Sequence, residues 1–155
     1  MKRRVKKASG RARHRDGNAI LEFAIGSGIL VAVFIGTFQF GFTFLQYNNL
    51  QNAVARGARY ASLVPYDSLT PAPSAAFQTA VQNMVLYGSP TAGTSPALAG
   101  LTAGNANVTV TFLNGVPNAV TVSISGYTIN SVFATTTLTK KPQVTYAYQG
   151  IWSPV

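Results

Sequence analysis

The feature of this sequence that most constrains its structure is a long stretch without charge. No Asp, Glu, Lys or Arg occurs from residue 23 through residue 55, and residues 23–45 are apolar apart from Gly, Ser, Thr and Gln39. A helix over residues 23–45 would be about 34 Å long, which is enough to cross a hydrocarbon core of about 30 Å. A buried helix of a soluble protein is the alternative, but such helices rarely stay apolar on all faces for this length. We therefore expect residues 23–45 to span a membrane.

The positive charge of the chain lies almost entirely before this stretch. Residues 1–17 contain eight of the 12 lysines and arginines and one of the three acids, so they carry +7 of the formal net charge of +9. The positive-inside rule then places the N-terminus in the cytoplasm and the residues beyond about 47 outside it. A secretory signal peptide is a competing interpretation, but its apolar region would be only about 7–15 residues long. A nucleic-acid-binding function for the basic arm is a weaker interpretation, because the arm lacks the aromatic residues that proteins use for sequence-specific recognition of nucleic acid. We therefore expect no nucleic-acid partner.

Few side chains in the rest of the chain could support catalysis. The single histidine, His14, lies in the basic arm, the chain has no cysteine, and the only acids beyond Gly17 are Glu22 and Asp67. These residues cannot form a Ser-His-Asp triad, a Cys-His pair or a zinc site of His and Cys. No GxxxxGK[ST] phosphate loop occurs either, and only a Ser-Lys arrangement stays formally open. We expect a protein that is not an enzyme and that uses neither a cofactor nor a metal.

The junction between the basic arm and the apolar run carries a recognisable signal. It reads Asp16-Gly17-Asn18-Ala19-Ile20-Leu21-Glu22-Phe23. A carboxylate at the mouth of a membrane helix is unfavourable, so Glu22 is expected to have a partner. The arrangement resembles the class III signal of type IV prepilins, in which a basic leader is followed by Gly, four residues, Glu and a long apolar helix. The resemblance implies that a prepilin peptidase removes residues 1–17 by cutting between Gly17 and Asn18, and that Glu22 pairs with the freed amine of a neighbouring subunit.

A wider segment, residues 16–64, is similar to the TadE-like minor pseudopilins of Flp/Tad (type IVb-like) pilus systems. After the Gly, the Glu-Phe pair and the apolar run, it continues into an Asn-containing helical turn and ends in Ala55-Arg56-Gly57-Ala58-Arg59-Tyr60-Ala61. The resemblance implies a minor pilin-like subunit that contributes to pilus assembly, priming or capping. It implies other pilin-like subunits, the prepilin peptidase, pilus assembly platform proteins and membrane lipid as partners.

The same resemblance implies a location. The protein would be a single-pass protein of the bacterial inner membrane with its C-terminal domain outside the cytoplasm, or at the pilus and cell surface after assembly. The alternative is a permanently anchored envelope binding module or adhesin that keeps its leader and uses its exported domain for binding.

One long helix is expected over residues 18–64. No proline occurs before Pro65, which disfavours helix at the residue that precedes it. Leu50, Val54 and Ala58 recur at four-residue intervals, which predicts a stripe that the C-terminal domain buries.

Two other sets of side chains on this helix are candidate contact sites. Phe34, Phe38 and Phe42 form an aromatic ridge, either for lipid contact or for helix packing in a fibre. Arg56 and Arg59 lie three residues apart, and we expect them on a solvated face, at lipid headgroups or against an acidic partner.

The remaining chain predicts a linker, residues 65–73, and an exported domain, residues 74–155. Ser74 and Gly88 have the residue types of helix caps and bound a short apolar stripe. Residues 88–106 are rich in Gly, Ser, Thr, Pro and Ala and are expected to be loop. Alternating residues then predict two strands joined by a longer loop at 114–118, with further strands near Tyr127 and Tyr146. The expected fold class is α+β and pilin-like, with a long transmembrane and amphipathic helix, a short helix, and one small antiparallel sheet of three or four strands packed on the helix.

Overall fold

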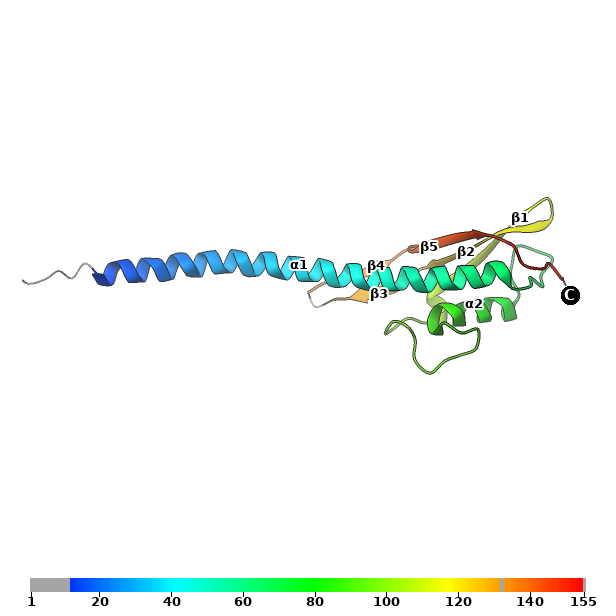
Figure 1. Ribbon diagram of the computed structural model, residues 1–155, viewed down its shortest axis with the longest axis horizontal. Helices are drawn as coiled ribbons and strands as arrows, with labels where there is room; N and C mark the ends of the chain where they lie inside the picture. Colours follow the sequence, from blue (N-terminus) through cyan, green and yellow to red (C-terminus); the bar gives the residue numbers. More distant parts are fainter. Residues whose placement is uncertain (1–11, 132, 155) are drawn as a thin grey trace, which may run out of the picture. The chain divides into compact units, whose positions relative to one another are not determined.

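The computed structural model describes residues 12–131 and 133–154 and confirms the α+β class (Figure 1). A long apolar helix is followed by a short helix and by small antiparallel sheets. The elements in chain order are α1 (Ala12–Leu63), α2 (Ala75–Tyr87), the 3-10 turn η1 (Ala103–Asn105), β1 (Ala106–Leu113), β2 (Val116–Ile124), β3 (Tyr127–Asn130), β4 (Thr135–Leu138) and β5 (Gln143–Ala147).

Helix α1 begins earlier than the sequence suggested. It starts at Ala12, inside the predicted leader, instead of at Asn18. Extending an existing helix needs no new nucleus, and Ala and Arg are good helix formers, so the single Gly17 does not stop it. The helix ends at Leu63, just ahead of Pro65. Its segment Gly17–Leu63 is long and apolar enough to cross a membrane, by length and composition.

The chain divides into two compact units between Phe40 and Gly41. In the first unit, the large apolar side chains of α1 that point outward include Phe23, Leu30 and Phe40, whose exposed fractions are 77%, 71% and 74%. A helix that is apolar on all sides and uncovered is suited to lipid or to other helices, not to water.

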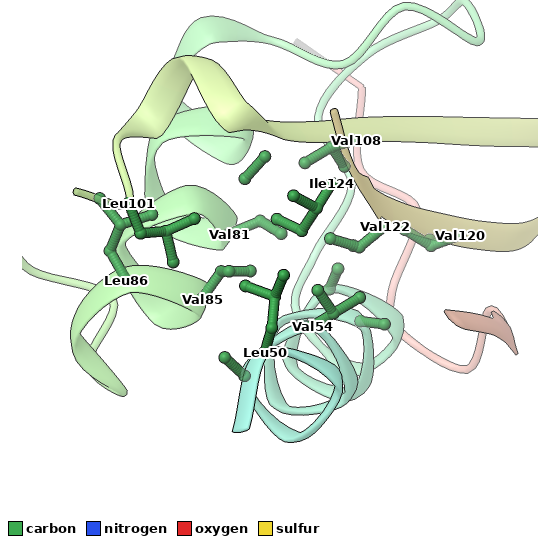
Figure 2. Close-up of a cluster of buried hydrophobic side chains, with 14 of the residues drawn as sticks. Leu50, Val54, Val81, Val85, Leu86, Leu101, Val108, Val120, Val122 and Ile124 are labelled. Carbon is green, nitrogen blue, oxygen red and sulfur yellow. The ribbon is translucent and has the colours of Figure 1, made fainter. Parts of the chain in front are cut away.

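The core of the second unit is built on one face of α1. Leu50, Val54 and Ala58 are fully buried, as their four-residue spacing predicts. Figure 2 shows the side chains of Leu50 and Val54 pointing toward Val85 of α2 and Val122 of β2. The division between the units therefore falls inside α1, and not at the predicted linker, because the second half of α1 shares its core with the elements that follow.

The predicted linker, residues 65–73, is packed against the end of the chain. Tyr66 is fully buried and forms an isolated parallel bridge with Trp152. Its amide donates to Ile151 O at 2.9 Å, and its carbonyl accepts from Ser153 N at 3.0 Å. The ring of Tyr66 also meets Phe77 edge-on, with 5.1 Å between the centroids. These contacts hold the C-terminal segment beside the end of α1.

Both caps of α2 are those that the sequence predicts. The Ser74 hydroxyl accepts a hydrogen bond from Phe77 N at 3.1 Å. Gly88 adopts a left-handed conformation with φ of 71° and its N–H donates to Met84 O. Val81 and Val85 are fully buried and carry the contact of α2 with α1.

The β1–β2 hairpin has a tighter turn than expected. Asn114 and Gly115 form a two-residue turn with φ values of 52° and 81°, so the predicted loop at 114–118 is wrong. Val116 and Pro117 already belong to β2. The register shifts between Thr111 and Phe112, which marks a β-bulge. The bulge allows Pro117 to lie in β2 although proline has no N–H to donate to a neighbouring strand.

The strands form two sheets instead of one. A three-stranded antiparallel sheet has the order β1-β2-β5, and β3 pairs with β4 in a separate two-stranded sheet. Gly126, with φ of 70°, turns the chain between β2 and β3. Strand β4 was not predicted, because its sequence Thr-Thr-Thr-Leu has no apolar alternation. Strand β2 is therefore central, and β1 and β5 are both edge strands.

Helix α2 lies close against α1 at Gly57. A Cβ at this position would overlap Val85 Cγ2 and would lie 3.5 Å from Val81 O. Gly57 is buried, and Val85 is a fully buried β-branched side chain with restricted rotamers in a close-packed interior. Glycine at this position therefore sets the distance between the two helices.

We predict that Gly57→Ala lowers the free energy of unfolding of the second unit by about 1–3 kcal/mol, because the overpacking exceeds the gain in helix propensity of about 1 kcal/mol. Thermal unfolding of the full chain in detergent measures the effect. Gly41→Ala is the matched control, since a Cβ there has nothing within 4 Å. Equal melting temperatures for the two variants would contradict the assigned contact.

Candidate functional site

The predicted processing and pairing residues lie together on α1. Gly17, Asn18 and Glu22 are all exposed, and a Cβ at Gly17 would have nothing within 4 Å. Asn18 and Glu22 are four residues apart, so they share one face of the helix. Among the residues that the structure describes, none forms a hydrogen bond or ion pair with the Glu22 carboxylate. The carboxylate is therefore available to a group from outside this chain.

The members of the predicted aromatic ridge differ in exposure. Phe34 and Phe38, in the first unit, have exposed fractions of 70% and 50%. Phe42 belongs to the second unit and is partly exposed. All three keep the four-residue spacing along α1, and Phe34 and Phe38 present ring surface that the first unit does not cover.

The sequence around Arg56 and Arg59 separates small inward residues from charged outward ones. Gly57 and Ala58 are buried against the rest of the second unit, whereas Arg56 and Arg59 are exposed. Neither guanidinium has a hydrogen-bond or ion-pair partner within the described part of the chain. The structure thus places both arginines on a solvated face, which is one of the placements that the sequence left open.

Arg59 also lines a hollow at the side of the second unit. This hollow has a volume of about 350 Å³ and is lined by Arg59, Ser62, Leu63, Tyr146, Ala147 and Gln149. It joins the last turn of α1 to strand β5. Sequence reasoning missed it, because the contact between the end of α1 and the end of the chain has no local signal.

Hydrogen bonds between the end of β5 and the end of α1 fix the shape of this hollow. Gln149 N donates to Ser62 O at 2.8 Å. The Tyr148 hydroxyl shares its single proton between Val64 O at 2.9 Å and Ile151 O at 2.8 Å. Gly150 fits between these groups only because it has no Cβ, which would lie 2.6 Å from the Tyr148 hydroxyl.

The outer face of the three-stranded sheet is polar, and the strands themselves contribute no charged side chain to it. Thr109, Thr121 and Thr145 form a row across the three strands, and the hydroxyls of Thr121 and Thr145 are 2.8 Å apart. A second hollow of about 350 Å³ on this face is lined by Asn107, Thr109, Thr121, Ser123, Ser125, Lys140 and Gln143. Its groups can donate and accept hydrogen bonds.

The same hollow contains the Ser-Lys combination that the sequence left open. Lys140 forms no hydrogen bond with Ser123 or Ser125, all of which lie in the described part of the chain. Within the described residues, no group of three or more His, Cys, Asp or Glu side chains could hold a metal ion. The geometry of this face suits binding more than catalysis.

Asp67, the acid nearest to α2, is engaged through one of its two carboxylate oxygens. Its carboxylate accepts a hydrogen bond from the Ser74 hydroxyl at 2.7 Å. Ser74 in turn caps α2, so the charge of Asp67 supports the N-terminus of that helix. Asp67 and Glu22 therefore have separate surroundings and do not form a carboxylate pair.

A comparison with protein families identifies the segment that contains most of these residues. Residues 17–59 match the family model described as TadE-like protein. No curated protein and no solved structure matches the chain. The TadE-like family is structural and not enzymatic. Together with the apolar helix, the match indicates a membrane-anchored, pilin-like protein associated with Tad pili.

We predict that Tyr148→Phe lowers the free energy of unfolding by about 1 kcal/mol at neutral pH, because Val64 O loses the hydroxyl donor and Ile151 O keeps only the donor from Tyr66 N. Thermal unfolding of the full chain measures this effect. Tyr146→Phe is the matched control, since Tyr146 is exposed and has no hydroxyl partner among the described residues.

The same variant tests the alkaline limit of stability. Burial raises the pKa of Tyr66, Tyr127 and Tyr148 above the usual value of 10.0. Unfolded tyrosines ionise at about pH 10 while these folded ones keep their protons, so stability is full below pH 10 and falls as the pH rises through the raised values. We expect Tyr148→Phe to reduce this slope. If the free energy of unfolding of Tyr148→Phe falls with pH as steeply as that of the wild type, Tyr148 does not contribute to the loss of stability above pH 10.

Proposed function

We propose that this protein, a TadE-like protein of Tad/Flp pilus systems, is a minor pilin-like (pseudopilin) subunit that contributes to pilus assembly, priming or capping. The observation that carries the proposal is that the matched segment, residues 17–59, coincides with α1 from the Gly17 junction to the helix face under the folded unit. The chain then adds an α+β unit that is large enough to be a specific contact surface at one end of a fibre.

The charge distribution supports a cytoplasmic N-terminus and an external second unit. Residues 1–17 carry +7, whereas residues 18–155 carry only +2. Residues 1–11 lie outside the described part of the chain, so this argument rests on composition and the positive-inside rule. With residues 23–45 across the inner membrane, the part of the second unit beyond residue 45 lies on the far side.

Processing after Gly17 would give Glu22 the partner that it needs. Cleavage by a prepilin peptidase leaves a positively charged amine on Asn18, and the exposed Glu22 carboxylate is accessible to the amine of a neighbouring subunit. Both charges are unfavourable in lipid when alone, and pairing offsets their desolvation. Membrane insertion would therefore need only the apolar run, while assembly would need the pair.

The exposed part of α1 supplies the surface for lateral packing. Before assembly, lipid would cover Phe34 and Phe38. In the fibre, helices of other pilin-like subunits would replace the lipid, and Gly28 and Gly36, with no neighbour within 4 Å of an added Cβ, would allow a close approach. Pilus assembly platform proteins are the expected partners for extracting the helix from the membrane.

A permanently anchored binding module or adhesin is the second candidate function. The polar face of the three-stranded sheet, with its hollow of about 350 Å³, favours it. This candidate keeps its leader, so the N-terminal residue of the membrane-bound protein distinguishes the two.

We predict that the protein recovered from membranes begins at Asn18. N-terminal sequencing or intact mass measures this directly. Gly17→Val should leave the leader in place, because the peptidase needs access to a bond that no side chain shields, whereas Gly36→Val should be processed normally. A wild-type protein that retains its leader would favour the anchored binding module.

We predict that Glu22→Ala reduces pilus output at least about tenfold, because removing one partner of an ion pair in an apolar setting costs about 3–5 kcal/mol. Membrane insertion should be unchanged. Pili are counted after shearing, and the membrane level of the variant is measured in parallel. Thr37→Ala, another exposed polar position on α1, is the control. Normal piliation with normal membrane levels of Glu22→Ala would count against the pairing role.

A further inference from the structure

Strand β5 leaves one side of the three-stranded sheet open. Tyr148 N donates to Asn118 O and Ile124 N donates to Pro142 O, so the even-numbered residues of this strand direct their backbone groups toward β2. By the alternation of an antiparallel ladder, Gln143, Thr145 and Ala147 direct their N–H and C=O groups away from it. Within the described residues, these three backbones have no hydrogen-bond partner, and their residues are exposed.

The opposite edge of the sheet is less accessible. Helix α2 packs along β1, and the Gln82 side chain donates to Ala106 O at 3.1 Å. Strand β5 also lacks the usual protection of an edge strand, since residues 143–147 contain no proline, no charge and no bulge. The open edge of β5 is therefore suited to pairing with a further strand.

Beside this edge lies the hollow that contains Arg59. A strand added to β5 would direct every second side chain to the face that Tyr146 occupies, over Arg59, Ser62 and Leu63. Tyr146 and Leu63 have exposed fractions of 40% and 54% and offer apolar surface to such side chains. The hydrogen bond from Gln149 N to Ser62 O holds β5 against α1, so the hollow and the edge form one surface.

The charge of this surface specifies the partner. The hollow contains the Arg59 guanidinium and no acid, and Arg59 has no ionic partner in the described part of the chain. A carboxylate on the added strand would form a charge-assisted hydrogen bond with the Arg59 guanidinium. A second copy of this chain offers no acidic side chain in an extended segment that is free to bind, because Asp16 and Glu22 lie in α1 and Asp67 is bound to Ser74.

We propose that the β5 edge binds an extended segment of a different protein as a fourth strand, with an acidic side chain of that segment on Arg59. The backbone of the segment pairs with Gln143, Thr145 and Ala147, and its alternate side chains lie on the polar face of the sheet. This surface is separate from Glu22 and from the apolar part of α1, so it does not depend on leader processing.

Synthetic peptides test this proposal on the full chain in detergent micelles. The probe is a capped seven-residue peptide of alternating Thr and Val with one central Glu in place of Val, compared with the same peptide carrying Gln. Binding is measured by titration of the ¹⁵N-labelled protein. We expect the Glu peptide to shift and protect the amides of Gln143, Thr145 and Ala147, and to bind about three- to tenfold more tightly than the Gln peptide at low salt.

Two pairs of variants separate the backbone and charge contributions. Ala147→Pro removes an outward N–H without removing a ladder bond to β2, and should abolish binding of both peptides, whereas Ala147→Val should retain it. Arg59→Gln should remove the preference for Glu over Gln, whereas Arg56→Gln, outside the hollow, should retain it. If Ala147→Pro does not fold, the comparison of Arg59→Gln with Arg56→Gln still tests the proposal.

Three results would overturn the proposal. The first is no binding of the Glu peptide by the wild-type protein, and the second is equal affinity for the two peptides. The third is self-association of the wild-type chain that Ala147→Pro abolishes, because this result would assign the edge to a second copy.

Discussion

The structure depends on the burial of one face of the second half of α1. Leu50, Val54 and Ala58 are covered by α2 and by the strands, and the chain has no disulfide and only one acid in this unit to form ion pairs. Apolar burial is therefore the main force that holds the unit together. Since the same helix carries the apolar segment that is long enough to cross a membrane, this segment and the folded unit share one element.

The parts of the fold that local sequence determines were predictable. The four-residue spacing of Leu50, Val54 and Ala58 indicated the buried stripe, and the caps at Ser74 and Gly88 act within a few residues of each other. The start of α1 was not predictable from the junction, because its resemblance to a leader signal gives no helix boundary and Ala12 to Asp16 contain nothing that stops a helix.

Pairings between distant segments were not predictable. Strand β5 joins β2, while β3 forms a separate sheet with β4. This arrangement depends on how the strands pack over α1, and the alternation of apolar and polar residues does not predict it. The candidate site shows the same limit. Glu22 and the arginines were found from residue type and spacing, but the hollow beside Arg59 depends on the bond from Gln149 N to Ser62 O, between residues far apart in sequence.

The boundary of the TadE-like match divides the functions of the chain. The match ends at residue 59, so it includes the apolar run of α1, Glu22, and the helix face with Gly57 that supports the second unit. A segment needed only for anchoring would not have to contain Gly57, whose contact is with α2. The matched segment thus contains both the apolar run and the helix face that carries the folded unit. The sheet and its β5 edge lie outside the match, which is where a subunit with a particular partner would be expected to differ from its relatives.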